Sequence, residues 1–427
     1  MARIAFAWEM GGELGHAMAC NALAQLLRAR GHHIAFMFRE LHGLSHLSRI
    51  AAQDFFQAPV SVSEGQGATS VPSSFADILV GCGYDRPQHL AGLLAAWFAL
   101  FERWKPDLVV ADFSPTALLA ARVMGLRRVS YSNGFSIPPK VSPLPAFRFD
   151  RPVTRDALVE VDSRALASVN GALALFGVPP LASLVQQFET DEDFLTTFPE
   201  LDSYARRPQS GYWGPRVSFD SGEEVKWPEG EGKCVAVYLR QDSAHVDALI
   251  DALAASPHRV AAFIPDLSPE RAAKLRSPKR VVATRPMKLG PLLAACDLLV
   301  SHGGNICPGT LMYGVAQLVF PTQYEQFLTA QRIGQIGAGA WLSPESSAEA
   351  VAQALARLLD DPSCKRAAAA FAARYPAYSP AEQQRRMVGR IEQILAQPAR
   401  PSALPPADPA LYSRPLQQDR EPRNEPR

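Results

Sequence analysis

The sequence has few of the features that mark secreted, membrane-spanning or nucleic-acid-binding proteins. Six cysteines are scattered through 427 residues without a CxxC pair or metal-ligand spacing, which favours reduced, buried thiols and indicates no metal site. The formal net charge is only +1, so the composition offers no argument for a nucleic-acid partner. The first apolar run is too short for a signal peptide, and no stretch approaches the roughly 18 apolar residues of a transmembrane segment. We therefore expect a cytoplasmic protein without a transmembrane segment.

Short apolar runs alternate with amphipathic stretches through most of the chain, which at 427 residues is long enough for two domains. The runs at 3–8, 33–38 and 107–113 are typical of buried strands, and a helix is expected between the first two, over about 16–30. The same alternation restarts at 233–239. Strands regularly separated by helices predict parallel βαβ units. Each half is therefore expected to be an α/β doubly wound parallel sheet.

Composition also predicts where these units begin and end. We expect an N-terminal Rossmann-like domain over 1–212, a linker rich in glycine, proline and charge over 213–232, and a C-terminal Rossmann-like domain over 233–397. From 398 to 427 the chain is rich in proline and has few apolar residues, so this tail is expected to be disordered. Residues 138–188 lose the strand–helix rhythm, and an insertion there could shape a cleft. We expect residues 138–210 to line the acceptor site.

The stretch LLVSHGGNICPGTLMYG, residues 298–314, joins a buried strand to a helix through a histidine and two glycines. Open α/β sheets bind ligands at the carboxyl ends of their strands, and His302, Gly303 and Gly304 follow directly on such an end. Glycines let a bulky anion approach the backbone, helix N-terminal amides attract negative charge, and a histidine adds a hydrogen-bond donor. These residues favour a phosphate-binding turn. A tight strand-to-helix turn that needs glycine for packing is the structural alternative.

The residues after this turn carry a resemblance to a known family. A Gly-Val pair, a short strand and a proline come next, and then an acidic residue and a glutamine, in the order Gly314-Val315, Pro321, Glu325-Gln326. With His302-Gly303-Gly304 in front, this order resembles the donor-binding motif of the UDP-glycosyltransferase-like family, whose members have the two-domain GT-B fold. The run GYWGPR at 211–216 is similar to the interdomain linker of that family. The resemblance extends over residues 1 to about 395.

The resemblance implies two Rossmann-like domains that face a cleft, with the nucleotide-sugar donor on the C-terminal domain. His302 and the backbone amides of Gly304 and Asn305 would hold the diphosphate and stabilise the leaving nucleoside diphosphate without a metal ion. Glu325 and Gln326 would hydrogen-bond sugar hydroxyls, and a helix N-cap pair is their structural alternative. A proline loop would lie under the nucleotide base, formed by Arg285, Pro286 and Met287. No metal is expected, and no cofactor besides the nucleotide sugar itself.

The sequence departs from the family pattern at the ribose. The segment from His302 to Gly314 is one residue shorter than the usual motif, so the ribose-binding acid of the family falls on Gly309 or Thr310. Neither residue can accept hydrogen bonds from both ribose hydroxyls, although Thr310 stays a candidate donor-side residue. A deoxyribose has no 2′-hydroxyl, so a dTDP-linked donor loses nothing by this change. We expect dTDP to bind at least as tightly as UDP, unless the loop at 285–288 holds the ribose instead.

The loop after the first apolar run, WEMGGELGHAMA, matches the family at Gly15 and His16, and Gly12 is expected beside them on the acceptor side. A neutral His16 can take the proton of an acceptor hydroxyl as that hydroxyl attacks the anomeric carbon. The resemblance puts a supporting acid at the end of a later strand, where Asp112 would fix the tautomer and stabilise the charged imidazole. Simple helix caps are the structural alternatives for both residues. A dinucleotide site is disfavoured because the G-x-G-x-x-G spacing is absent, although Glu40 could mimic its ribose acid.

Taken together, the residues and the resemblance predict an inverting glycosyltransferase. It would move a sugar from a UDP- or dTDP-linked donor to a hydroxyl of a small-molecule or lipid-like acceptor. Inversion follows from a single in-line displacement with one base, because no second, nucleophilic carboxylate is evident. Two alternatives stay open, a nucleotide-sugar epimerase of the same architecture and a non-catalytic glycosyltransferase-like partner subunit. The presence of both His16 and Asp112 argues against the partner subunit, because a pure binding module needs neither.

Overall fold

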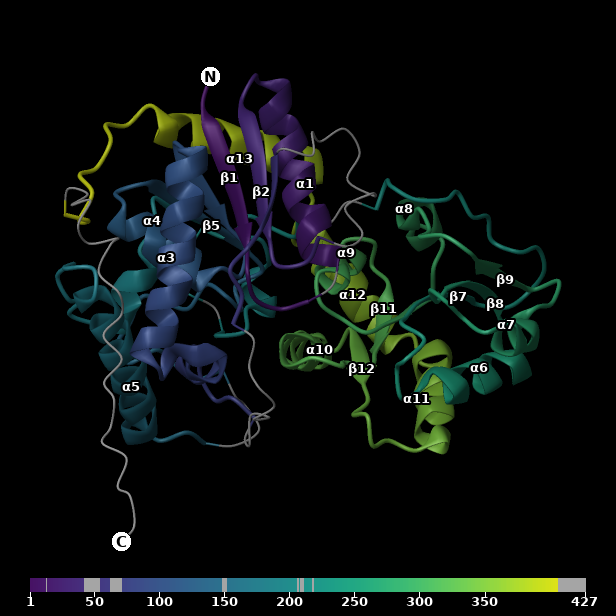
Figure 1. Cartoon of the computed structure of the whole chain (residues 1–427). Coiled ribbons are helices and arrows are strands. Elements are labelled where there is room, and N and C mark those ends of the chain that lie inside the picture. The colour runs from purple at the N-terminus through teal and green to yellow at the C-terminus, as the bar shows by residue number, and fades with distance from the viewer. Residues whose placement is uncertain are drawn as a thin grey trace, which may run out of the picture.

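Two α/β lobes make up the protein (Figure 1), for which the computed structural model describes residues 1–12, 14–41, 54–61, 71–147, 152–205, 207, 211–216 and 219–405. Each lobe contains a parallel six-stranded sheet. The N-terminal sheet has the order β3-β2-β1-β4-β5-β6, with β1 (Arg3–Trp8), β2 (His33–Phe38), β3 (Phe55–Gln57), β4 (Leu108–Ala111), β5 (Arg127–Ser132) and β6 (Glu192–Leu195). The C-terminal sheet has the order β12-β11-β10-β7-β8-β9, with β7 (Cys234–Tyr238), β8 (Arg259–Phe263), β9 (Arg280–Ala283), β10 (Leu298–Ser301), β11 (Ala316–Val319) and β12 (Gly339–Trp341).

Helices connect these strands and pack on the sheets. Those that follow the strands of the N-terminal sheet are α1 (Leu14–Ala29), α2 (Phe75–Leu79), η3 (Val80–Tyr84), α3 (Pro87–Trp104), α4 (Pro115–Val123), α5 (Arg155–Ala174), η4 (Leu184–Phe188) and η5 (Pro199–Leu201). The later ones are α6 (Val246–Ala255), α7 (Pro269–Leu275), α8 (Leu289–Leu293), α9 (Ile306–Leu311), α10 (Tyr324–Ile336), α11 (Ala348–Asp360), α12 (Ser363–Ala373) and α13 (Pro380–Leu395). The predicted fold class, two doubly wound parallel sheets, is confirmed. Within the described ranges, no helix combines the length and the apolar character that a membrane span requires.

In both sheets the strand order reverses beside the first strand of the lobe. β1 lies between β2 and β4, and β7 lies between β8 and β10. Loops that leave two such neighbouring strands diverge to opposite sides and open a crevice at the carboxyl edge of the sheet. His16 follows β1, Asp112 follows β4, and His302 follows β10. The topology therefore brings the predicted residues of each lobe to its crevice.

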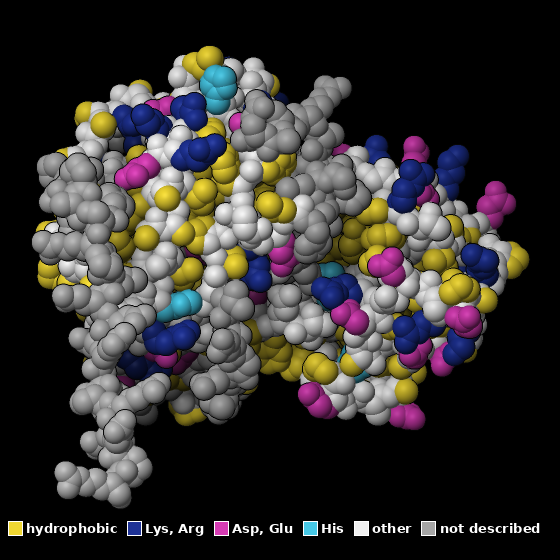
Figure 2. Space-filling view, viewed as in Figure 1, with side chains coloured by type: hydrophobic (Ala, Val, Ile, Leu, Met, Phe, Trp, Pro, Cys, Tyr) yellow, Lys and Arg dark blue, Asp and Glu magenta, His cyan; other side chains and the backbone are white. Residues whose placement is uncertain are grey.

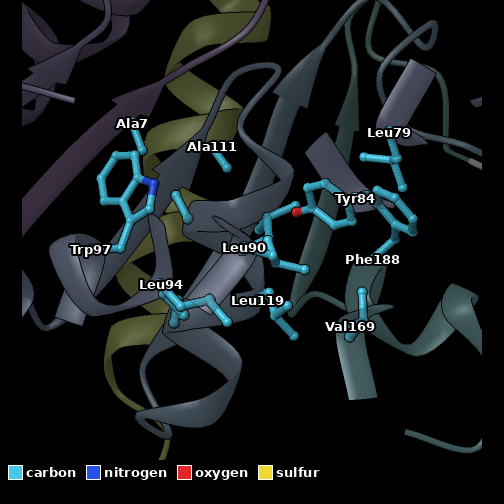
Figure 3. Close-up of a cluster of buried hydrophobic side chains, with 14 of the residues drawn as sticks. Ala7, Leu79, Tyr84, Leu90, Leu94, Trp97, Ala111, Leu119, Val169 and Phe188 are labelled. Carbon is cyan, nitrogen blue, oxygen red and sulfur yellow. The ribbon is translucent and has the colours of Figure 1, made fainter. Parts of the chain in front are cut away.

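The N-terminal sheet is covered by apolar layers on both faces. On one face, α3 contributes a stripe with helical spacing whose side chains are at most 6% exposed: Leu90, Leu94, Trp97, Phe101 and Trp104. Figure 3 shows part of this layer, in which Leu119 of α4 and Val169 of α5 lie near the α3 side chains. The aromatic residues of α3 therefore belong to the core.

The last helix crosses from the C-terminal lobe back to the N-terminal lobe. Its apolar side chains pack into the layer that α1 covers, and they are Met387, Val388, Ile391 and Ile394. Arg30 at the end of α1 donates to both carboxylate oxygens of Glu392, at 3.2 and 3.1 Å. The expected domain boundary at 397 assigned this helix to the C-terminal domain. Its apolar period predicts a buried face but does not specify which lobe buries it.

Residues 398–405 pack against the N-terminal lobe, so the disordered tail predicted from 398 begins too early. Arg400 pairs with Asp191, and the backbone N–H of Ala403 donates to the last carbonyl of α4 at 2.7 Å. Ion pairs and backbone hydrogen bonds hold this stretch, which has too few apolar groups to be recognised as ordered from its composition. The rest of the predicted tail, 406–427, lies outside the described residues.

Candidate active site

Two predicted acceptor-side residues meet at the carboxyl edge of the N-terminal sheet. His16 lies in the first turn of α1, and Asp112 directly follows β4. His16 Nδ1 and Asp112 Oδ2 are 2.9 Å apart, within hydrogen-bonding distance. The Asp112 side chain is fully buried, whereas 19% of the His16 side chain is exposed. When Nδ1 carries the proton and donates it to the carboxylate, Nε2 is left as a hydrogen-bond acceptor.

A buried arginine joins this pair, and the sequence analysis did not single it out. Arg216 Nη1 donates to the same Asp112 oxygen at 2.7 Å and to the Tyr131 carbonyl at 2.8 Å. Burial by itself would raise the pKa of Asp112, but the positive charge of Arg216 and the contact with His16 lower that pKa below its usual value. Asp112 is therefore ionised at neutral pH. The signal in the sequence is an arginine directly after the GYWGP run, in a segment assigned to the linker.

The His16 ring lies between two aromatic side chains and a glycine. Trp8 stacks on it with ring centroids 5.2 Å apart and an interplanar angle of 18°, and the Phe113 ring centroid lies 6.4 Å away. Phe113 has a φ of +46°, a left-handed conformation that is uncommon outside glycine. Gly11 has a φ of +76°, and a Cβ at this position would lie 3.1 Å from His16 Nε2. Gly11 therefore keeps Nε2 accessible.

The two glycines predicted for the acceptor side do not have this role. A Cβ at Gly12 would come no closer than 3.9 Å to its nearest neighbour, Glu40 Oε1, and one at Gly15 would meet nothing within 4 Å. Neither position therefore requires glycine on steric grounds. The resemblance placed the acceptor-side glycines at these two positions, whereas the one that the local geometry needs, Gly11, lies directly before Gly12.

The predicted phosphate turn has a backbone that glycine adopts most easily. Gly303 and Gly304 have φ values of +99° and +72°. A Cβ at Gly303 would also lie 3.1 Å from a side chain of β11, so this glycine is needed for packing as well. Beside Gly304 there is more room, since the nearest atom to a Cβ would be Gln326 Cγ at 3.9 Å. His302 and Asn305 are half-buried on either side of the glycines, and the turn thus offers an imidazole and backbone amides to an anion.

Two predicted donor-side residues are engaged within the protein instead. Thr310 is fully buried, and its hydroxyl donates to the Ile306 carbonyl at 2.9 Å. Gln326 is 3% exposed, and its Oε1 accepts from the Thr322 backbone and hydroxyl, both at 3.0 Å, and from the Gln323 backbone at 3.2 Å. Gln326 therefore caps α10, which was its structural alternative. Hydrogen bonds within one turn of a helix thus engage the Thr310 hydroxyl and the side-chain oxygen of Gln326.

Glu325, in the first turn of α10, reaches the N-terminal lobe. Its Oε1 accepts a hydrogen bond from Asn133 Nδ2, directly after β5. The neighbouring Tyr324 packs on Phe147, with ring centroids 5.3 Å apart. On the face shown in Figure 2, acidic, basic and histidine side chains are visible where the two lobes meet. The carboxylate predicted to bind the sugar therefore lies at the junction of the lobes.

The proline loop before α8 is divided between the surface and the core. Arg285 and Pro286 are exposed, and Arg285 Nε lies 3.3 Å from a carboxylate oxygen of Glu223. Met287 is 3% exposed and packs in an apolar cluster of the C-terminal lobe. The Pro286 carbonyl accepts from the Glu223 N–H at 2.7 Å, which ties the loop to the segment between the lobes. Arg285 and Pro286 are accessible to a nucleotide base, but the Met287 side chain is not.

A cleft of about 380 Å³ lies between the interlobe segment, α9 and residues 372–380, and its lining includes Gly309, Tyr313 and Asp220. Of the two residues at the predicted ribose position, Gly309 thus faces an open volume, whereas Thr310 is buried. In the part of the chain that the structure describes, no three His, Cys, Asp or Glu side chains are grouped so that they could hold a metal ion.

Two parts of the chain are similar in sequence to known proteins. Residues 247–389 match the family model of the C-terminal domain of erythromycin biosynthesis protein CIII-like proteins. A segment of 86 residues is 36% identical to demethyllactenocin mycarosyltransferase of Streptomyces fradiae. This segment spans 20% of the chain and 19% of the mycarosyltransferase, so the match covers about a fifth of each protein.

Solved structures resemble nearly the whole chain. Spinosyn rhamnosyltransferase SpnG complexed with spinosyn aglycone matches with a TM-score of 0.65 and 18% identity over 91% of this chain and 100% of its own. The Streptomyces sp. SF2575 glycosyltransferase SsfS6, complexed with thymidine diphosphate, matches with a TM-score of 0.58 and 22% identity over 92% of this chain and 100% of its own. At these identities the likeness establishes the two-domain fold, and the family model establishes the type of C-terminal domain. The chain therefore has the two-domain GT-B fold of these glycosyltransferases, and residues 247–389 are similar to the C-terminal domain of erythromycin biosynthesis protein CIII-like proteins.

Proposed function

We propose that the protein transfers a sugar, with inversion at the anomeric carbon, from a nucleoside diphosphate donor to a hydroxyl of a small-molecule or lipid-like acceptor. The observation that carries this proposal is the 2.9 Å contact between His16 Nδ1 and Asp112 Oδ2. It leaves Nε2 able to accept a proton on the side that Gly11 keeps open. A protein that only binds a nucleotide sugar has no need for an imidazole held in this way by a buried carboxylate.

In the proposed reaction, the acceptor oxygen bonds to the anomeric carbon while its proton moves to His16 Nε2. The bond from that carbon to the phosphate oxygen breaks with its electron pair, and a nucleoside diphosphate leaves. The ionised Asp112 stabilises the imidazolium as it forms. Arg216 shares the charge of this carboxylate and so limits how strongly Asp112 increases the basicity of the imidazole. A single displacement with one base inverts the anomeric configuration.

On the donor side, the proposal rests on the turn after β10 and on Glu325. His302 and the amides of Gly304 and Asn305 are groups that suit a diphosphate. Glu325 suits sugar hydroxyls because it lies at the lobe junction, where a donor sugar and an acceptor would have to meet. The thymidine diphosphate bound in the similar SsfS6 supports a dTDP-linked donor, as does Gly309 at the predicted ribose position.

The half-buried ring of Phe113 beside the base supports an apolar acceptor, and buried aromatic rings pack behind it. Phe113, the neighbour of His16, contacts both Phe75 and Phe135 with ring centroids 5.9 Å apart. Phe135 continues this series to Phe147, with ring centroids 5.4 Å apart. Phe147 belongs to the stretch expected to line the acceptor site. The names of the similar proteins, a mycarosyltransferase and a rhamnosyltransferase complexed with spinosyn aglycone, support a natural-product acceptor.

Product analysis tests this function against the two alternatives. The protein is incubated with dTDP- and UDP-linked α-hexoses, with and without a panel of apolar, ring-containing alcohols. Liquid chromatography with mass spectrometry follows the nucleotides and acceptors, and proton NMR gives the anomeric configuration of the product. The proposal predicts release of nucleoside diphosphate that increases with the acceptor, and a β-linked product.

Three other outcomes would contradict the proposal in different ways. A changed donor sugar in the absence of any acceptor indicates an epimerase. Binding of the donor without any turnover, and also without its hydrolysis by water, indicates a partner subunit. An α-linked product contradicts the single-displacement mechanism while leaving glycosyl transfer in place.

A further inference from the structure

A second buried carboxyl group lies near the base and its acid and takes no part in the proposed transfer. Glu9 directly follows β1 and is 6% exposed. Trp97 Nε1 donates to its Oε2 at 2.9 Å, and the Thr116 backbone N–H donates to its Oε1. Thr116 lies in the first turn of α4, whose N-cap residue Ser114 makes no side-chain cap. Glu9, at the end of β1, therefore caps the N-terminus of α4, which follows β4.

Three hydrogen bonds join β1 and the loop after it to the turn after β4 and the first turn of α4. Two are backbone bonds, from the Asp112 N–H to the Ala7 carbonyl at 2.9 Å and from the Met10 N–H to the Phe113 carbonyl at 3.0 Å. The third is the bond that the carboxyl group of Glu9 accepts from α4. The first loop leads to the base in α1, and the turn contains the acid. The carboxyl group of Glu9 thus helps to fix the distance between the two reactive side chains.

The turn that carries the acid has a conformation that needs support from its surroundings. Phe113 has a φ of +46°, in a region that residues other than glycine occupy only when neighbouring contacts hold them there. Trp8, the residue directly before Glu9, stacks on His16. A shift at the end of β1 therefore displaces both the turn and the ring that packs on the base.

We propose that Glu9 is a positioning residue for His16 and Asp112, and that it holds the turn carrying the acid against the loop carrying the base. Its effect on the transfer rate rests on the proposed function. The placement of the imidazole against the carboxylate is a property of the protein without substrate and can be measured separately.

The support that Glu9 gives depends on its charge. Burial raises the pKa of Glu9 to about 7, although its N–H donors favour the ionised form. The titratable groups that face it are Cys82 and Tyr84 of η3, whose pKa values burial also raises, and Arg39 acts on Cys82 from the end of β2. Cys82 and Tyr84 therefore keep their protons near neutral pH. Glu9 is charged above about pH 7 and then accepts both N–H bonds with charge assistance.

The tautomer of His16 provides the first test. Long-range proton–nitrogen NMR spectra of protein labelled with ¹⁵N-histidine report which ring nitrogen carries the proton, and His16→Ala assigns the signals. In the wild type, the contact with Asp112 is expected to favour the Nδ1–H tautomer. Glu9→Ala should lose this preference at pH 8, whereas Glu9→Gln should retain it, because its amide oxygen can still accept from α4. Glu102→Ala, on an exposed position of α3, is the matched control.

Transfer kinetics provide the second test. Glu9→Ala is expected to lower kcat by about 10- to 100-fold through misplacement of the base, with the Kd of nucleoside diphosphate changed by less than about twofold. The ratio of wild-type kcat to Glu9→Gln kcat should rise from pH 6 to pH 8, because only the wild type gains a charge. Titration of the base is common to both proteins and cancels in this ratio.

The outcomes separate this inference from the proposed function. If the His16 tautomer in Glu9→Ala equals that of the wild type, the positioning role is overturned. If the kcat ratio is flat, the dependence on charge is overturned. If the wild type transfers no sugar at all, the proposed function fails, and the tautomer measurement still decides the role of Glu9.

Discussion

Arg216 donates to Asp112 from the segment that joins the two lobes, with Nη1 2.7 Å from Oδ2. Both side chains are at most 1% exposed. The same carboxylate oxygen lies 2.9 Å from His16 Nδ1. Asp112, which we propose as the acid behind the base, is therefore connected to the interlobe segment as well as to its own sheet.

Replacing Arg216 by methionine is expected to destabilise the protein by about 3–5 kcal/mol, because Asp112 would remain as a buried charge without its partner. Combining Arg216→Met with Asp112→Asn should recover most of this loss, since no isolated charge then remains. Urea unfolding followed by circular dichroism measures both variants. A double variant as unstable as Arg216→Met alone would show that lost packing, and not the unpaired charge, is the cause.

Stability should fall with rising pH because of Glu9. Its pKa is 4.5 in the absence of perturbation and about 7 in the folded protein. Between these values the folded protein keeps a proton that the unfolded chain releases, so the free energy of unfolding decreases as the pH rises from about 4.5 to 7. At roughly 1.4 kcal/mol per pKa unit, the decrease is about 3 kcal/mol. Glu9→Gln should lack this contribution, and denaturant unfolding of both proteins at pH 5 and pH 7.5 measures it. An identical pH dependence in the two proteins would be evidence against a raised pKa.

Removing the hydrogen bond between Asn133 and Glu325 should weaken use of the nucleotide sugar without weakening binding of the free nucleotide. Asn133→Ala should lower kcat/KM for the nucleotide sugar about tenfold, which corresponds to ~1.4 kcal/mol. The Kd of the free nucleoside diphosphate should stay the same, because this ligand lacks the sugar that Glu325 is proposed to contact. Gln335→Ala, on an exposed position of α10, is the control. An equal loss of nucleoside diphosphate affinity would mean that the bond orders the lobe junction as a whole.

The cleft beside α9 predicts whether the protein prefers dTDP or UDP. Gly309 has no side-chain acceptor for ribose hydroxyls, and each hydrogen bond to a carboxylate would contribute about 1.5–3 kcal/mol, so dTDP should bind at least as tightly as UDP. Isothermal titration calorimetry with both nucleotides measures this. Tenfold tighter binding of UDP would contradict it and would implicate Asp220, which lines the same cleft. Asp220→Asn would then remove the preference for UDP.

The fold could be predicted from the sequence because strands buried on both faces produce continuous apolar runs. The stretch 3–8, for example, corresponds to β1, and 298–301 corresponds to β10. Helix periodicity places α13 correctly within the chain but does not specify the lobe on which it packs. A buried face can be recognised from one segment alone, whereas its partner depends on the whole fold.

Arg216 and Asn133 were missed in the sequence because their partners lie in distant segments that only the whole fold brings together. Arg216 is 104 residues from Asp112, and Asn133 is 192 residues from Glu325. Neither of these separations leaves a periodic signal in the sequence, whereas His16 and Asp112 could be predicted because each matches a motif of the family.

Two predicted donor-side residues make hydrogen bonds within their own helix turns. Thr310 bonds a carbonyl four residues earlier, and Gln326 bonds backbone groups three and four residues before it. Such bonds within a helix turn compete with ligand binding for the same side chain. A motif match specifies the position of a residue on the helix but not whether its hydrogen-bonding groups are free.

The transfer rate of His16→Ala is the most direct measure of the proposed chemistry. Removal of the base should lower kcat by a factor on the order of 10² to 10⁴. The Kd of nucleoside diphosphate, for which we propose a site on the other lobe, should change by less than about twofold. His33→Ala, exposed at the start of β2 and away from the carboxyl edge of the sheet, should leave both quantities unchanged. A His16→Ala variant that transfers sugar at the wild-type rate would contradict the assignment of His16 as the base.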